Sequence, residues 1–211
     1  MFLSMKNKLL NIGKYGGIIG AIIASIFYFE GGYTDQHNDP GGETKYGITK
    51  AVAIEYGYTG AIKDLSKEVA YEIYKDKFII KPGYSNLLDL SPALTHKLVD
   101  AGVNVGTSRS SLWFQKALNS LNRDGKDYQE IDEDGVCGKQ TINAYKALVD
   151  KRGNVLACQL MIKLIDAQQA THYMNLKNLK EYTVGWVINR VGNIPLSACE
   201  NYEITNIKPM D

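Results

Sequence analysis

The chain has 211 residues, of which 45% are hydrophobic, and this suffices for one or two compact domains with a buried core. Its formal net charge is +1, and no basic or acidic tail stands out. Broad nucleic-acid binding is therefore disfavoured, because it needs a basic face that neutralises phosphates. Near-neutrality leaves a polyanionic substrate open, since the local field of a cleft matters more than the total charge.

The first 29 residues combine a positive flank with an apolar run. Lys6, Lys8 and Lys14 precede the apolar residues 15–29, and no acidic residue occurs before Glu30. This layout is typical of a secretory signal or a signal anchor. The run is shorter than the ~20 residues that span a bilayer comfortably, and glycines and alanines dilute its isoleucines. The alternative is a buried core helix of a soluble protein.

Residues 30–49 are rich in turn formers. The segment 39–42, Asp-Pro-Gly-Gly, is a strong turn signal, and the interleaved tyrosines and threonines suit short strands. We predict a loop or a β-hairpin here, followed by a helix that Thr49 caps and that runs to Tyr56.

The rest of the chain has the pattern of helices separated by short junctions. Further helices are predicted from Ser66, from Ser91-Pro92, over 110–121, near 140–150, over 154–175 and in a last segment up to Arg190. The polar segment 122–141 is expected to be an exposed loop with a tight turn, and the residues from Pro195 onward are expected to fray. The predicted fold class is mainly α, with one small β element near the start.

The three cysteines and three histidines are scattered, without the spacing of a metal site. We therefore expect neither a metal nor a cofactor. Cys137, Cys158 and Cys199 are compatible with buried free thiols. In an oxidising compartment they would permit one disulfide and leave one thiol over.

Glu30 is the strongest candidate for acid chemistry. It follows Phe29 directly, and a carboxyl among apolar side chains is desolvated, which raises its pKa. A glutamic acid that stays protonated near neutral pH donates its proton to a leaving glycosidic oxygen. A hairpin could bring Asp39 back over Glu30, to hold a water or stabilise positive charge on the sugar. The alternative is that Glu30 merely begins the soluble part, with Asp35, Asp39 and Glu43 as solvated loop residues.

Two stretches carry a resemblance to a known family. EGGY at 30–33 and NDPGGETKYGIT at 38–49 closely resemble the opening motif of glycoside hydrolase family 108, which comprises N-acetylmuramidases of phages and bacteria. From about Asn104 onward the chain resembles the predicted peptidoglycan-binding region that follows in that family. This second resemblance rests on NVG at 104–106, FQKAL at 114–118 and DGVCGKQT at 134–141.

The resemblance implies a lysozyme-like, two-lobed helical fold with a small β-hairpin after the catalytic glutamate and a hydrophobic helix before it. It divides the chain into an anchor over 1–29, a catalytic region over 30–104 and a peptidoglycan-binding region over 105–200. The catalytic acid of the family maps onto Glu30.

Further site residues follow from the same resemblance. Lysozyme-like phage enzymes use a Glu, Asp, Thr trio, and Glu30, Asp39 and Thr44 occur in that order. The interval from Asp to Thr is one residue shorter than usual, so Thr49 or Asp35 could replace Thr44. Candidate substrate-binding residues are Tyr33, Tyr46, Thr49 and Asn104. Trp113, Tyr182 and Trp186 are either core residues or stacking partners for sugar rings.

The predicted function is hydrolysis of the β-1,4 bond between N-acetylmuramic acid and N-acetylglucosamine in bacterial peptidoglycan, causing host cell lysis. The N-terminal run looks like the signal-anchor-release segment of some phage endolysins. We therefore expect a monomer in the host inner membrane, with its N-terminus cytoplasmic, that moves to the periplasm after release and binds no nucleic acid. Two other hypotheses stay open, a membrane-tethered, non-catalytic peptidoglycan-binding protein and a soluble helical regulator.

Overall fold

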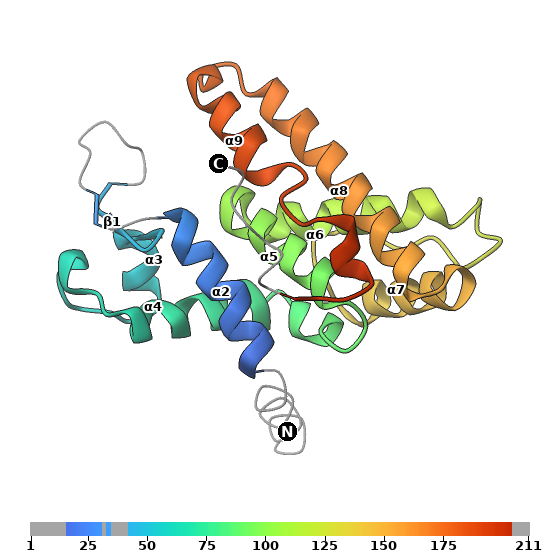
Figure 1. Ribbon diagram of the computed structural model, residues 1–211, viewed down its shortest axis with the longest axis horizontal. Helices are drawn as coiled ribbons and strands as arrows, with labels where there is room; N and C mark the ends of the chain where they lie inside the picture. The colour runs from blue at the N-terminus through green and yellow to red at the C-terminus, as the bar shows by residue number, and fades with distance from the viewer. Residues whose placement is uncertain (1–15, 31–32, 35–41, 204–211) are drawn as a thin grey trace. The chain divides into compact units, whose positions relative to one another are not determined.

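The computed structural model describes residues 16–30, 33–34 and 42–203, and of residues 28–30 it describes the backbone alone. Most of this part of the chain is helical, with one small hairpin (Figure 1). The main elements are α2 (Gly16–Glu30), β1 (Thr44–Lys45), β2 (Ile48–Thr49), α3 (Lys50–Glu55), α4 (Lys67–Tyr74), α5 (Pro92–Val105), α6 (Thr107–Leu121), α7 (Lys139–Arg152), α8 (Asn154–Asn175) and α9 (Thr183–Arg190). The predicted class, mainly α with a hydrophobic helix before a small hairpin, is confirmed. Contacts divide the chain into two compact units, Met1–Lys77 and Phe78–Asp211.

The first unit contains α2, the hydrophobic helix. Ile19, Ile22, Ile23 and Ile26 are each at most 1% exposed. They follow the i, i+3, i+4, i+7 spacing that places residues on one face of a helix. Within the unit α2 packs on α4. Among the described residues, no helix combines the length and the apolar character that crossing a membrane requires. The apolar run therefore forms a helix with a buried side, and its insertion into a membrane stays a prediction.

The β element of this unit is a tight antiparallel hairpin. Thr44 of β1 lies opposite Thr49 of β2. The turn between them contains Tyr46 at φ 52° and Gly47 at φ 71°. Positive φ at both central residues is the signature of the two-residue turn whose twist matches that of the flanking strands. Thr34 pairs with Thr44 on the other side through two backbone hydrogen bonds of 2.9 Å.

Three helix caps agree with the sequence predictions. The hydroxyls of Thr49, Ser66 and Ser91 each accept a hydrogen bond of 3.3 Å from the backbone N–H three residues further on. Each hydroxyl satisfies one of the N–H groups that the first helical turn leaves without a partner. The helices α3, α4 and α5 therefore begin where the polar side chains predicted.

In the second unit, helix α5 is the central element. Ten consecutive residues, 93–102, are buried, and α6 and α8 both pack against the helix. All its residues except Val105 fall within the predicted catalytic region, 30–104, although contacts assign the helix to the second unit. Gly106 separates it from α6 at φ 89°, a conformation that glycine adopts without strain. Helix α6 then begins at Thr107, earlier than the predicted 110, because its first turn is polar and shows no apolar periodicity.

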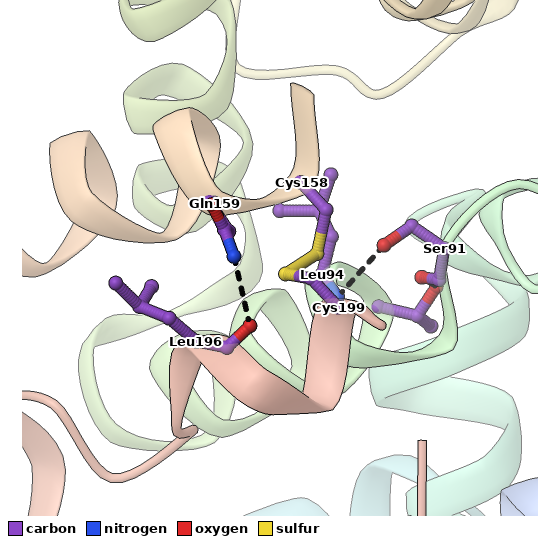
Figure 2. The surroundings of a disulfide bond; sticks show 7 residues. Ser91, Leu94, Cys158, Gln159, Leu196 and Cys199 are labelled. Atoms are coloured by element: carbon purple, nitrogen blue, oxygen red, sulfur yellow. Dashed lines mark hydrogen bonds between the residues drawn. A yellow bond between two sulfur atoms is a disulfide. The ribbon is translucent and has the colours of Figure 1, made fainter. Parts of the chain in front are cut away.

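The segment after Pro195 differs from the prediction. We expected fraying, but Leu196–Cys199 forms a short 3-10 helix. Cys199 is joined to Cys158 of α8 by a disulfide, and the Gln159 amide donates a 3.4 Å hydrogen bond to the Leu196 carbonyl (Figure 2). A covalent link over 41 residues holds this segment on α8, which the local sequence could not indicate.

Candidate functional site

Glu30 is the last residue of α2, and its backbone is helical. Its side chain lies outside the described part of the structure, as do Asp35 and Asp39. The proposed acid and its predicted partner aspartate therefore stay predictions. Tyr33, Thr44, Tyr46 and Thr49 are described within the first unit, and Asn104 within the second.

Three aromatic rings pack around the last turns of α2. The ring of Phe27, three residues before Glu30, lies 5.6 Å from the ring of Tyr46 and 5.3 Å from that of Tyr74, which it meets nearly edge-on at 72°. The Tyr74 hydroxyl donates a 3.0 Å hydrogen bond to the Tyr46 carbonyl. Positive φ is uncommon for a non-glycine residue, and these contacts hold Tyr46 in it. We call Phe27, Tyr46 and Tyr74 the aromatic clamp, which fixes the end of α2 against the hairpin turn and the end of α4.

Three threonines lie side by side across the small sheet. Thr44 pairs with Thr34 on one edge and with Thr49 on the other. Residues that pair directly across strands project to the same face, so the structure brings Thr44 together with its predicted substitute, Thr49. Their hydroxyls are engaged locally. Thr44 Oγ1 donates to the Gly42 carbonyl at 3.1 Å, and Thr49 Oγ1 caps α3.

Glu43 connects the loop to α3. Its Oε1 accepts a 3.1 Å hydrogen bond from the Tyr33 hydroxyl, and its Oε2 lies 3.0 Å from Lys50 Nζ. The hydrogen bond from Lys50 is the main cause that lowers the pKa of Glu43, and the one from Tyr33 adds to it. The sequence placed Glu43 only among solvated loop residues. The structure gives it a structural role, because it orients Tyr33, a predicted substrate-binding residue.

Asn104 lies at the end of α5, where its side chain belongs to a polar chain in the second unit. The Tyr173 hydroxyl donates a 2.6 Å hydrogen bond to Asn104 Oδ1 and accepts one of 2.8 Å from Gln169. Gln169 Oε1 in turn accepts a 2.8 Å hydrogen bond from the buried Lys97 ammonium. These contacts give Asn104 a structural partner, and its predicted contact with substrate stays a prediction.

A buried ionic network in the same unit was missed from the sequence. Lys97 is fully buried, and its Nζ lies 2.5 Å from Asp166 and 2.6 Å from the Arg190 carbonyl. The guanidinium of Arg190 pairs with Asp100 at 2.5 Å. One signal was present, because Lys97 occurs on the apolar face of α5 one turn after Leu94. A lysine at such a position needs acceptors brought by other helices.

Comparisons with known proteins show which families the two parts of the chain resemble. Residues 23–106 match the family model Glycosyl hydrolase 108, and residues 109–191 match the model Predicted Peptidoglycan domain. The structure of SagA from Brucella abortus is similar, with a TM-score of 0.68 and 25% sequence identity, over 89% of this chain and 96% of that one. No curated protein matches the chain.

The fold and these matches define a peptidoglycan-degrading glycoside hydrolase, and the predicted lysozyme-like fold class is confirmed. The chain carries a glycosyl hydrolase 108 domain followed by a peptidoglycan domain, in the order that the motifs predicted. Peptidoglycan is accordingly its binding partner. The first match includes Glu30 and the hairpin, and α9 falls within the second.

Proposed function

We propose that the chain is an N-acetylmuramidase that hydrolyses the β-1,4 bond between N-acetylmuramic acid and N-acetylglucosamine, with Glu30 as its general acid. The observation that carries the proposal is the glycosyl hydrolase 108 match over residues 23–106, which includes the segment from Glu30 to Thr49. In glycoside hydrolysis a carboxylic acid protonates the oxygen of the leaving sugar while positive charge develops on the ring.

The position of Glu30 supports the role of an acid. It is the last residue of a helix, and the carbonyl groups at that end carry partial negative charge, which favours the neutral form of a carboxyl. The residues that precede it in sequence are apolar, which acts in the same direction. The aromatic clamp holds the helix one turn earlier, so the backbone that carries the acid has a fixed position.

Asp39 is the second carboxylate of the proposed mechanism. It belongs to the segment between Thr34 and Thr44, whose ends are joined by two backbone hydrogen bonds. In the proposal Asp39 stabilises the positively charged ring or holds the attacking water. In the same proposal Thr44, with Thr49 as the alternative, supplies a hydroxyl, and Tyr33 and Tyr46 contact the glycan. Asn104, in the second unit, is a further predicted glycan contact.

We also propose that the enzyme is exported, held in the host inner membrane by its N-terminal segment, and active in the periplasm as a monomer that lyses the host. The disulfide between Cys158 and Cys199 supports an oxidising compartment. The isoleucines of α2 that would face lipid are buried in the folded chain. Anchoring and folding would therefore exclude each other, which keeps the enzyme inactive until release.

The decisive experiment compares Glu30→Gln with Glu55→Gln on purified bacterial cell walls. Glu55 is an exposed carboxylate of the same unit that pairs with Lys77, so it is a matched control. We expect Glu30→Gln to abolish lysis and to retain wall binding, and Glu55→Gln to act like the wild type. Mass analysis should find reducing muramic acid ends. Reducing glucosamine ends, cut peptides, or normal lysis by Glu30→Gln would each refute the assignment.

A further inference from the structure

Three aromatic rings follow one another at the junction of α8 and α9, one from each helix and one from Tyr182, the residue just before α9. The rings of Tyr173 and Trp186 lie 5.3 Å apart between centroids, and those of Trp186 and Tyr182 lie 5.7 Å apart. Their planes are inclined by only 31° and 30°. A core pair of the same unit, Phe114 and Tyr145, is inclined by 62°. The three rings are thus closer to parallel than the rings of that pair.

This series of rings runs from the interior to the surface. Tyr173 is 1% exposed, Trp186 is half-buried, and Tyr182 is 52% exposed. Trp113, the other tryptophan, is 7% exposed and belongs to the core. Trp113 reaches only the wall of a separate pocket that it shares with His172, so of the three candidates for sugar stacking in the sequence, Tyr182 and Trp186 are the more exposed. We call these two residues the aromatic platform.

The platform rests on a firmly held base. Helix α9 folds back along the last turns of α8 (Figure 1), and Arg190, at its end, is paired with the buried Asp100. Behind Trp186, the Tyr173 hydroxyl is fixed by hydrogen bonds with Asn104 and Gln169. Rings that are already held in place lose little conformational freedom when a ligand binds, so more of the contact energy appears as affinity.

We propose that the aromatic platform is a stacking subsite for the glycan strand of peptidoglycan, and this rests on the proposed function. An aromatic face suits the apolar C–H face of a pyranose ring. Asn189 is exposed and lies three residues after Trp186, on the same side of the helix, where its amide can bond a hydroxyl or acetamido group. The platform also falls within residues 109–191, which match the peptidoglycan domain.

The opposite side of α9 offers a surface for other partners. Val184, Val187 and Ile188 are 69%, 39% and 47% exposed, and their i, i+3, i+4 spacing places them on one stripe. A lipid surface or a second copy of the chain would bury this apolar stripe. A glycan that stacks on the platform would leave the apolar stripe exposed. Substitutions on the two sides of α9 therefore distinguish glycan binding from binding to lipid or to a second copy.

The test uses the full-length chain with Glu30→Gln, so that binding is measured without cleavage. Cosedimentation with purified cell walls should show that Tyr182→Ala and Trp186→Ala each weaken binding about 5- to 10-fold. Trp186→Phe should restore much of it, since a ring is retained. Ile188→Ala, on the apolar stripe, is the matched control and should bind like the parent chain.

Each outcome decides between the platform and its alternatives. Unchanged wall binding by both alanine variants, or no binding by the parent chain, overturns the platform. The platform is also overturned if Ile188→Ala is the one variant that loses binding. That loss would be measured as binding to anionic lipid vesicles, or as self-association of the chain by light scattering. If the chain with Glu30 intact fails to cleave walls while the platform variants still lose binding, the proposed muramidase fails and the platform stands.

Discussion

Opening the disulfide between Cys158 and Cys199 should destabilise the second unit markedly. The bond joins the short helix Leu196–Cys199 to α8 across a sequence separation of 41 residues. In the chain-entropy model, closing a loop of that length reduces the conformational entropy of the unfolded chain, which raises the free energy of unfolding by about 4 kcal/mol. For a chain of this size such a loss corresponds to a fall in Tm of about 10 °C.

The assay is thermal unfolding followed by far-UV circular dichroism, with and without reductant. The wild type should lose stability on reduction, whereas Cys158→Ala and Cys199→Ala should be less stable throughout and insensitive to reductant. Cys137→Ala is the matched control. Cys137 is free and buried, and burial raises the pKa of its thiol to about 12, so it should neither pair nor react. Its alanine variant should keep the full response to reductant.

Two results would refute this reasoning. If the wild type unfolds at the same temperature with and without reductant, the bond is absent or contributes nothing. If Cys137→Ala abolishes the response, the pairing is different. A thiol titration of the denatured, unreduced protein supplies an independent count, which should be one free thiol per chain.

The remaining predictions concern the interior of each unit. Phe27→Ala should lower the free energy of unfolding by about 2 kcal/mol. It should also reduce lysis by more than this loss of stability explains, because the end of α2 is released. Normal lysis after correction for the folded fraction would contradict this prediction. Lys97→Met should lower the free energy of unfolding, measured in urea, by about 3–5 kcal/mol, because it leaves the Asp166 carboxylate without its partner. The double variant Lys97→Met/Asp166→Leu should recover part of that loss. A loss below about 1 kcal/mol in Lys97→Met would disprove a tight ion pair. Burial, with a smaller effect of Lys97, lowers the pKa of His96 from 6.5 to about 4. The unfolded chain then binds more protons below pH 6.5, so the free energy of unfolding should fall by about 3 kcal/mol as the pH drops to 4, and His96→Gln should flatten that slope.

The candidate site was only partly open to sequence reasoning. The motif predicted a hairpin after Glu30 and a cap at Thr49, and both follow from short-range chemistry, since turn residues and hydroxyls act on neighbours within four positions. The aromatic clamp joins Phe27 to Tyr74, which is 47 positions further along the chain, and no local sequence pattern predicts that contact. Glu43 likewise gained its role only when folding brought Tyr33 and Lys50 to its two oxygens.

By itself, the sequence determined the elements of this protein: the helix starts at Ser66 and Ser91, the apolar run that forms α2 and the order of the two domains. Only the tertiary structure decided which cysteines pair, what surrounds Lys97, and which of the tryptophans reaches the surface. The physical reason is the distance along the chain over which each interaction acts. Caps and periodicity arise from neighbours along the chain, whereas burial, ion pairing and disulfide geometry depend on which distant helices pack together.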